Sequence, residues 1–214
     1  MILYYIIVPL AWLVFNIGFR VRCEGRENLK KVGTKGCIIA PNHISAIDPV
    51  FIVITRFWGQ RMMVFAKKEL FEINPFLSWF FRCAGAVCVR GTKEEVGAID
   101  DTVKKCKEGG TLLIFPEGTT IHNGIGYVDG LPAHAKAGVA VIGVRTGAIL
   151  VPVFVDGPKR LFHRTRIIFG EPYTPVYTGR HGTSEEMQKI ADDILTAAYA
   201  LGGQAVGGKP LCNE

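Results

Sequence analysis

The sequence predicts an α/β fold in which helices flank a mainly parallel, mixed sheet, with an apolar, membrane-anchoring helix at the N-terminus. Short apolar stretches of strand type alternate with helical patterns after Gly36, as is typical of βαβ units in a parallel sheet. Three polar turns, at His43, Arg90 and Glu117, each follow one of these strands directly, and ligands collect at the carboxyl ends of parallel strands. The third observation is that residues 1–19 contain no charged side chain.

The N-terminal segment, residues 1–20, is expected to be a membrane anchor. A helix of this kind would be about 28 Å long, near the lower limit for crossing a bilayer, and Pro9 interrupts it. It could form one short span or lie embedded in one leaflet. A buried core helix is the alternative, which the lack of a polar face disfavours. Arg20, Arg22 and Arg26 follow and place the rest of the chain on the cytoplasmic face.

The composition favours anionic partners. The chain has 214 residues and a formal net charge of +6, so phospholipid headgroups, phosphorylated substrates or an acidic carrier protein are candidates. No nucleic-acid-binding motif is present, and no nucleic acid partner is expected. The six cysteines include no C-x-x-C pair and no histidine partner at zinc-finger spacing, which argues against zinc and indicates reduced thiols facing the cytosol.

The alternation predicts one domain, residues 21–203, followed by a flexible tail, residues 204–214. Strands are expected at residues 37–40, 62–66, 86–89, 111–115, 149–155 and 167–169. Helices are expected at residues 49–57, 93–108, 136–145 and 184–201. The second and fourth begin after Thr92 and Thr183, each with a glutamate three residues on, which is the capping-box pattern. Pro152 lies inside a predicted strand and indicates an edge position or a bulge.

Three further segments each allow two interpretations. The aromatic residues of segment 70–81 would form a core helix or the wall of a groove for a lipid chain. The glycine-rich residues 121–132 form a loop long enough to be a lid or a substrate loop. A basic cluster after residue 155 is a solvated face or a contact with acidic headgroups or an acidic carrier. Its members are Lys159, Arg160, His163, Arg164 and Arg166.

His43 and Asp48 form the candidate catalytic pair. They stand five positions apart, so on a helix they would point about 140° apart and on a strand to opposite faces. A bend can bring them together, because Asp48 followed by Pro49 is typical of a helix start. Asp48 would then hold one imidazole nitrogen and leave the other free to take a proton from a hydroxyl. Taken alone, the two residues could equally be a helix cap and a loop histidine.

Four short motifs resemble those of the glycerolipid acyltransferases, in the same order and at similar spacing. They are Asn42-His43-Ile44-Ser45 with Asp48, Val89-Arg90-Gly91, Phe115-Pro116-Glu117-Gly118-Thr119 and Val151-Pro152-Val153. One such motif is a weak signal, whereas four in order are a strong one. The length and the apolar N-terminus are similar to those of the 1-acyl-sn-glycerol-3-phosphate acyltransferases (lysophosphatidic acid acyltransferases).

This resemblance implies transfer of a fatty acyl group from a thioester, on acyl carrier protein or coenzyme A, to the free sn-2 hydroxyl of lysophosphatidate. The product would be phosphatidate, for phospholipid synthesis at a membrane. His43 would be the general base and Asp48 the residue that orients it. Because a thioester is already activated, direct attack by the acceptor needs no protein nucleophile. No metal and no redox cofactor are expected, and the acyl thioester is counted as a co-substrate.

The resemblance also implies an acceptor site and a supporting set. The substrate-binding residues would be Lys67, Arg90, Glu117, Gly118, Thr119 and Lys136, and the supporting residues Asn42, Ser45 and Pro152. The cations suit a phosphate, and glycine lets backbone N–H groups approach an anion. Glu117 would repel a phosphate and is expected to orient a cation or a glycerol hydroxyl instead.

Thr120 departs from the family's pattern, because the third motif commonly ends in arginine at this position. The acceptor could therefore be another lysolipid, such as an amino-acid lipid or a lysophospholipid with a headgroup. Two alternatives from other classes remain at this point. One is a non-catalytic lipid-binding module, and the other is a lipid hydrolase in which the pair activates water.

Overall fold

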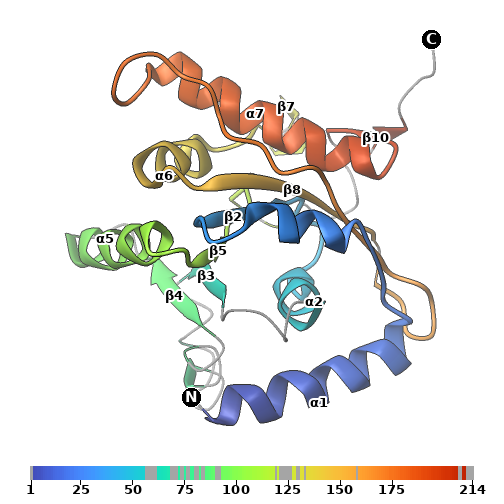
Figure 1. Cartoon of the computed structure of the whole chain (residues 1–214). Helices are drawn as coiled ribbons and strands as arrows, with labels where there is room; N and C mark the ends of the chain where they lie inside the picture. The colour runs from blue at the N-terminus through green and yellow to red at the C-terminus, as the bar shows by residue number, and fades with distance from the viewer. Residues whose placement is uncertain are drawn as a thin grey trace.

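The structure is a computed structural model (Figure 1). It describes residues 2–55, 62–67, 72, 75, 78–79, 82, 85–89, 93–118, 120, 127–128, 131–132, 134–157, 159–206 and 209–210.

A mixed, mainly parallel sheet of seven strands forms the centre of the described part, in the order β1-β9-β8-β2-β5-β3-β4. Neighbouring strands run parallel except for β8 and β9, which are antiparallel. The α/β prediction is therefore confirmed. The strands are β1 (Arg22–Glu24), β2 (Cys37–Pro41), β3 (Met62–Lys67), β4 (Ala86–Val89), β5 (Thr111–Leu113), β8 (Ile149–Val155) and β9 (Arg166–Phe169).

Helices cover both faces of the sheet and make a three-layer domain (Figure 1). Helices α5 (Lys93–Lys107), α6 (Gly138–Thr146) and α7 (Ser184–Leu201) share one core with Ile38 and Ala40 of β2. Helices α1 (Ile2–Phe19) and α2 (Asp48–Thr55), with a 3-10 helix, η1 (Arg26–Val32), lie on the other face. There they pack on Cys37 and Ile39, because successive side chains of a strand point to opposite faces.

The capping box predicted for the last helix is confirmed. The Thr183 hydroxyl accepts a hydrogen bond from the Glu186 N–H at 3.1 Å, and the Glu186 carboxylate accepts one from the Thr183 N–H at 2.7 Å. The buried stripe that follows includes Met187, Ile190 and Ile194, as the helical spacing predicts. This stripe fixes the rotation of α7 on the sheet, and the end of the helix at Gly202 agrees with the prediction.

Helix α1 is held to the domain by aromatic contacts on one side only. The Phe15 and Phe19 rings lie 5.0 Å and 5.2 Å from the ring of Phe51 in α2, while Leu10 and Ile17 on the other side are exposed. A fully buried core helix is therefore wrong for α1. No helix within the described residues is both long and apolar enough to cross a bilayer.

Strand β8 lies inside the sheet, between β9 and β2, so the edge position suggested by Pro152 is wrong and the bulge alternative fits. Between the pairs Val153↔Phe169 and Leu150↔Tyr173, two residues of β8 lie opposite three residues of the segment that follows β9. The Pro152 carbonyl accepts a bond from the Gly170 N–H at 2.8 Å. Proline is tolerated there because β9 has just ended, so its missing N–H removes no regular ladder bond.

Some predicted segments are shorter or different in the structure. The stretch expected to be a loose tail contains a two-stranded pair, β10 (Gln204–Ala205) with β11 (Lys209–Pro210). The predicted lid loop contains β6 (Tyr127–Val128) and β7 (Leu131–Pro132), which pair antiparallel. Most of segment 70–81 and the Thr92 cap lie outside the described residues.

Candidate active site

Asn42 fixes the position where β2 turns into the site. Its side-chain amide donates to the Val155 carbonyl at 3.1 Å, and its amide oxygen accepts from the Val155 N–H at 2.7 Å. The buried side chain thus continues the β2–β8 pairing beyond the last strand residue. It satisfies backbone groups at a strand end that would otherwise be buried without partners, and the supporting role expected for Asn42 stays a prediction.

The predicted meeting of His43 and Asp48 is confirmed. The His43 Nδ1 atom lies 3.3 Å from Asp48 Oδ2. The same carboxylate oxygen accepts bonds from the backbone N–H groups of Ile44 at 2.9 Å and Ser45 at 2.7 Å. Asp48, the first residue of α2, is fully buried. The turn between β2 and α2 therefore wraps around one carboxylate, and Ser45 contributes through its backbone.

The other face of the His43 ring borders the third motif. The imidazole stacks on the Phe115 ring at a centroid distance of 4.0 Å, and its Nε2 atom lies 3.1 Å from the Thr120 hydroxyl. The imidazole side chain is 14% exposed. With the Nδ1 proton donated to Asp48, Nε2 is the basic nitrogen and accepts from Thr120. Thr120, at the position that departs from the family's pattern, therefore contacts the nitrogen expected to take the substrate's proton.

Lys159 is a member of the site that the sequence did not reveal. Its ammonium lies 2.9 Å from Asp48 Oδ1, and its side chain is only 3% exposed. The same ammonium donates to the Asp156 carbonyl and stands 5.8 Å from the centroid of the Phe51 ring. For Lys159 the prediction of a solvated basic face is wrong. No local pattern distinguishes it from the exposed Arg160 beside it, because its partner comes from another part of the chain.

Glu117 holds the turn at His43 through a hydrogen bond to its backbone. Its side chain is buried, and its Oε2 accepts the backbone N–H of His43 at 2.6 Å. Its Oε1 accepts the hydroxyl of Tyr199, from α7, at 2.6 Å. Both carboxylate oxygens of Glu117 thus bind protein donors, and its predicted role, orienting a cation or a glycerol hydroxyl in the acceptor site, stays a prediction.

The environment of Glu117 raises the pKa of its carboxyl to about 7. Burial is the main cause; the bonds from Tyr199 and His43 oppose it, and the Asp48 carboxylate adds to it. Burial, with Glu117 beside it, also raises the pKa of the Tyr199 hydroxyl. Tyr199 therefore remains a donor at neutral pH, whereas Glu117 changes charge near it.

The raised pKa of Glu117 predicts that the stability of the protein depends on pH. Glu117→Gln should remove this dependence. The folded carboxyl, with its pKa near 7, holds a proton that the unfolded chain loses at its ordinary value of 4.5, so stability falls as pH rises between these values. We expect the free energy of unfolding of the parent, relative to Glu117→Gln, to fall by roughly 3 kcal/mol from pH 4 to pH 8. Urea unfolding of both proteins at a series of pH values measures this difference. Parallel profiles would contradict it.

Gly118 and Lys136 border the same turn. Gly118 has a φ of 67°, a left-handed conformation that favours glycine. The Lys136 N–H donates to the Pro116 carbonyl at 2.7 Å, and its exposed side chain lies across Gly118, where an added Cβ would stand 2.6 Å from its Cδ atom. The structure thus brings the predicted residue Lys136 to the third motif, where its side chain is exposed.

The turns after parallel strands converge, as predicted, for His43 and Glu117, which are joined by a hydrogen bond. Lys67 ends β3, a strand of the same parallel set. Arg90 and Thr119 lie outside the described residues. Within the described part, no group of three or more histidine, cysteine or acidic residues could hold a metal ion.

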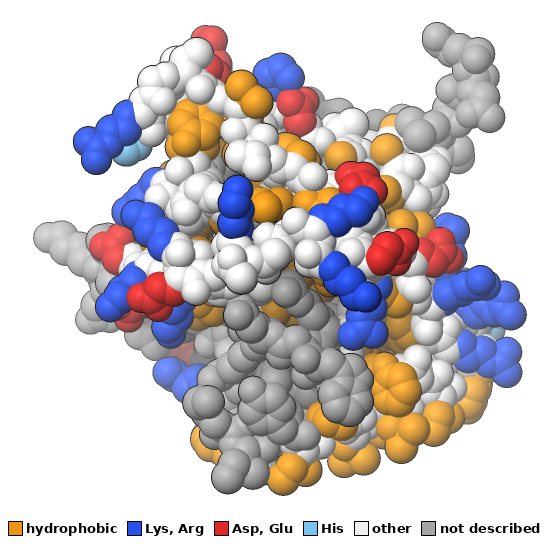
Figure 2. Space-filling view, in the orientation of Figure 1, with side chains coloured by type: hydrophobic (Ala, Val, Ile, Leu, Met, Phe, Trp, Pro, Cys, Tyr) orange, Lys and Arg blue, Asp and Glu red, His pale blue; other side chains and the backbone are white. Residues whose placement is uncertain are grey.

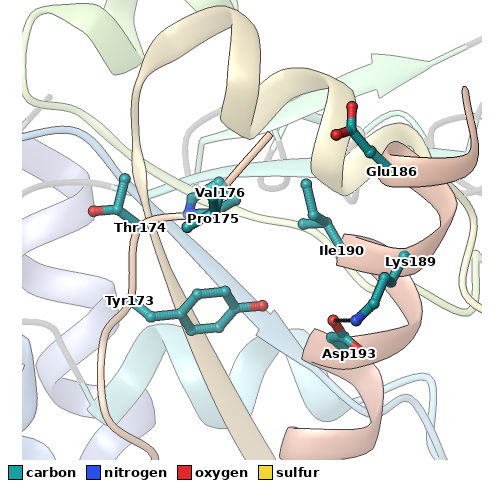
Figure 3. A pocket seen from close by; sticks show the side chains of 8 residues that line it. All are labelled: Tyr173, Thr174, Pro175, Val176, Glu186, Lys189, Ile190 and Asp193. Carbon is teal, nitrogen blue, oxygen red and sulfur yellow. Dashed lines mark hydrogen bonds and ion pairs between the residues drawn. The ribbon is translucent and has the colours of Figure 1, made fainter. Parts of the chain in front are cut away.

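A separate cavity of about 310 Å³ lies between residues 173–176 and α7 (Figure 3). Glu186, Lys189 and Asp193 line it, and the Lys189 ammonium is paired with the Asp193 carboxylate at 2.8 Å. None of its lining residues belongs to the His43 site.

Fold and site together define a three-layer α/β protein with a histidine–aspartate pair at the carboxyl edge of its parallel strands. The sequence model of the Acyltransferase family matches residues 20–156, which include both members of the pair. The chain therefore belongs to the acyltransferase family.

Curated relatives and a solved structure agree with this class. The chain is 29% identical over 160 residues to the 1-acyl-sn-glycerol-3-phosphate acyltransferase of Borreliella burgdorferi, covering 74% of this chain and 58% of that protein. It is 29% identical over 165 residues to the protein of the same name from Bacillus subtilis, covering 75% and 77%. The crystal structure of PlsC, the 1-acyl-sn-glycerophosphate acyltransferase of Thermotoga maritima, matches with a TM-score of 0.61 and 26% identity over 85% of this chain and 70% of that one. The chain thus spans less than two thirds of the length of the Borreliella burgdorferi relative.

Proposed function

We propose that this protein transfers a fatty acyl group from an acyl thioester to the sn-2 hydroxyl of lysophosphatidate and so forms phosphatidate. The observation that carries the proposal is the geometry of His43, whose Nδ1 faces the buried Asp48 while Nε2 faces the Thr120 side chain. The names of the Borreliella burgdorferi and Bacillus subtilis relatives support the choice of acceptor.

In the proposed reaction, Nε2 of His43 takes the proton of the acceptor hydroxyl as its oxygen attacks the thioester carbonyl. The new C–O bond forms, the C–S bond breaks, and the imidazolium returns the proton to the leaving thiolate. Asp48 stabilises the imidazolium during this exchange, because its carboxylate already lies at Nδ1. The acceptor hydroxyl would take the place of Thr120 Oγ1 or lie beside it, within reach of Nε2.

The donor and acceptor are both anionic, which suits a chain with a net charge of +6. Acyl carrier protein and coenzyme A are both compatible donors. Of the cations expected to bind the acceptor phosphate, Lys136 is the one whose side chain the structure describes, and this exposed residue lies at the third motif.

We also propose that α1 attaches the protein to the cytoplasmic face of a membrane. Its outer side exposes Ile6, Leu10 and Ile17, which is more apolar surface than a water-facing helix needs. Arg20 and Arg22 follow at its C-terminal end, where anionic headgroups would meet them. This location would bring the enzyme to its lipid acceptor.

The proposed activity is tested by supplying purified protein with a labelled long-chain acyl thioester and a set of acceptors in mixed micelles. The acceptors are lysophosphatidate, a lysophospholipid with a headgroup, an amino-acid lipid and water alone. We expect labelled phosphatidate from the first. Product from another lysolipid, with none from lysophosphatidate, would identify that lysolipid as the acceptor and implicate Thr120 in the choice. Release of free fatty acid without transfer would show a hydrolase. Binding of lysolipid and thioester without any product would indicate a non-catalytic module.

A further inference from the structure

The connection between β8 and β9 is fastened to the C-terminal end of α1. The Phe162 N–H donates to the Gly18 carbonyl, and the Thr165 N–H donates to the Phe19 carbonyl at 3.1 Å. A Cβ placed on Gly18 would stand 3.2 Å from the Leu161 side chain. Residues 159–164, named the β8–β9 loop from here on, are therefore continuous in space with α1, although the two are far apart in the sequence.

The tip of the β8–β9 loop presents two large apolar side chains to solvent. Leu161 is 59% exposed and Phe162 64% exposed. On the neighbouring helix, Val14 and Ile17 are exposed to a similar extent. Figure 2 shows hydrophobic side chains along the lower edge of the molecule, over α1, with a group of basic side chains at the right-hand end of that edge. The loop thus extends the apolar edge formed by α1.

The backbone of this region is held in an unfavourable conformation. Phe162 has a φ of 64° and Arg20 a φ of 43°, and among the described residues these are the two non-glycine residues with positive φ. A left-handed conformation is unfavourable for a side chain with a Cβ. Such conformations persist where the surrounding structure imposes them, and they occur most often at functional sites. Here both flank the end of α1, and one of them belongs to an exposed phenylalanine.

Arginines surround the apolar tip and leave positive charge available. Arg20, Arg160 and Arg164 are exposed, and none of the three has an ion pair with another described residue. Arg22 and Arg166, also exposed, pair loosely with acidic neighbours at 3.7 Å and 3.5 Å. Apolar side chains next to unpaired arginines match a surface whose outer layer is anionic and whose interior is apolar, which is the chemistry of a bilayer with acidic phospholipids.

We propose that the β8–β9 loop is a second membrane-contacting element, and that with the exposed side of α1 it forms one docking surface for an anionic phospholipid bilayer. This goes beyond the proposed attachment through α1 and does not depend on the identity of the acyl acceptor. Lys159 of the same loop is paired with Asp48, so docking would hold the histidine–aspartate pair next to the membrane surface, where a lysolipid acceptor resides.

The test measures partition of the full chain onto vesicles by lipid titration and sedimentation. Vesicles contain phosphatidylglycerol and phosphatidylcholine in equal parts, or phosphatidylcholine alone. We expect Leu161→Ser with Phe162→Ser to lower the partition constant on the mixed vesicles about ten-fold or more, because two apolar side chains no longer enter the lipid. Val176→Ser is the matched control, since Val176 is 90% exposed but lies next to α7 on the opposite layer, and it should partition as the parent does.

Further variants test the contribution of the arginines to binding and the depth to which residue 162 enters the lipid. Arg160→Gln with Arg164→Gln should weaken partition on the mixed vesicles about five-fold for each arginine and leave partition on pure phosphatidylcholine unchanged. Lipids with brominated acyl chains should quench the fluorescence added by Phe162→Trp and spare that added by Val176→Trp. This second measurement remains informative if the double serine variant does not fold, which circular dichroism reports.

Unchanged partition of a folded double serine variant, or equal quenching at positions 162 and 176, would overturn the proposal. Loss of binding to an acidic carrier protein without loss of vesicle binding would assign the surface to that protein and overturn it as well. Turnover with detergent-dispersed substrate is measured separately. Absent turnover with normal vesicle binding would refute the proposed reaction and leave the docking surface intact.

Discussion

Replacing His43 by alanine is expected to lower kcat for acyl transfer about 10²- to 10⁴-fold, the usual contribution of a positioned general base. The imidazole is the group in this site that can both take the acceptor's proton and return it to the thiolate, and its Nδ1 atom is already held by Asp48 at 3.3 Å. Water cannot replace it with the same orientation. The measurement is the rate of labelled product formation at saturating thioester and acceptor.

His181→Ala is the matched control, because His181 is an exposed histidine just before α7, and it should leave kcat unchanged. The His43 ring also stacks on Phe115, so thermal unfolding must show that His43→Ala is folded at the assay temperature. A folded His43→Ala variant with parental kcat would remove the histidine–aspartate pair from the reaction and refute the mechanism.

Replacing Lys159 by methionine is expected to destabilise the protein by about 3–5 kcal/mol, the loss typical when one partner of a buried ion pair is removed. Methionine has a similar length, so little packing volume is lost. What is lost is the cation 2.9 Å from Asp48 Oδ1, and a buried carboxylate without that cation must be protonated or drawn toward water. Either change would also disturb the contact of Asp48 with His43, so kcat should fall as well.

The control for this prediction is Lys189→Met. Lys189 and Asp193 are separated by 2.8 Å, nearly the same distance, but their side chains are 74% and 58% exposed. Exposed pairs contribute about 0–1 kcal/mol, so this variant should stay close to the parent in urea unfolding. Equal losses of unfolding free energy in the two variants would show that burial of the Lys159–Asp48 pair adds nothing to stability. This result would contradict the structural role given to the pair.

Much of the fold and the central pair could be predicted from the sequence, because the signals involved are short-range. Strand and helix periodicity depends on neighbouring residues, and the capping box at Thr183 needs a span of only three residues. The meeting of His43 with Asp48 is also local, since one turn and one helix start decide it. The prediction that β8 is an edge strand was wrong, because β8 lies between two strands. A proline shows only that one N–H donor is missing from the strand, and it does not indicate which strands lie on either side.

The contacts of Glu117 and the burial of Lys159 could not be predicted in this way. Glu117 binds the backbone of His43, which is 74 positions away, and the hydroxyl of Tyr199, which is 82 positions away. Lys159 and Arg160 are adjacent basic residues, yet the side chain of one is buried against Asp48 and the other is exposed. Composition and spacing are the same for both, so the difference arises only when β8 is placed beside β2.

The sequence by itself determined the alternation of the main strands and helices after Gly36, the acyltransferase motifs and the pair His43–Asp48, since each is encoded in a few consecutive residues. The tertiary structure alone decided which charges are buried, which oxygens Glu117 uses and which side of α1 remains exposed. The physical reason is that burial and electrostatics depend on groups brought together from distant parts of the chain. Periodicity and capping, by contrast, act within a single element.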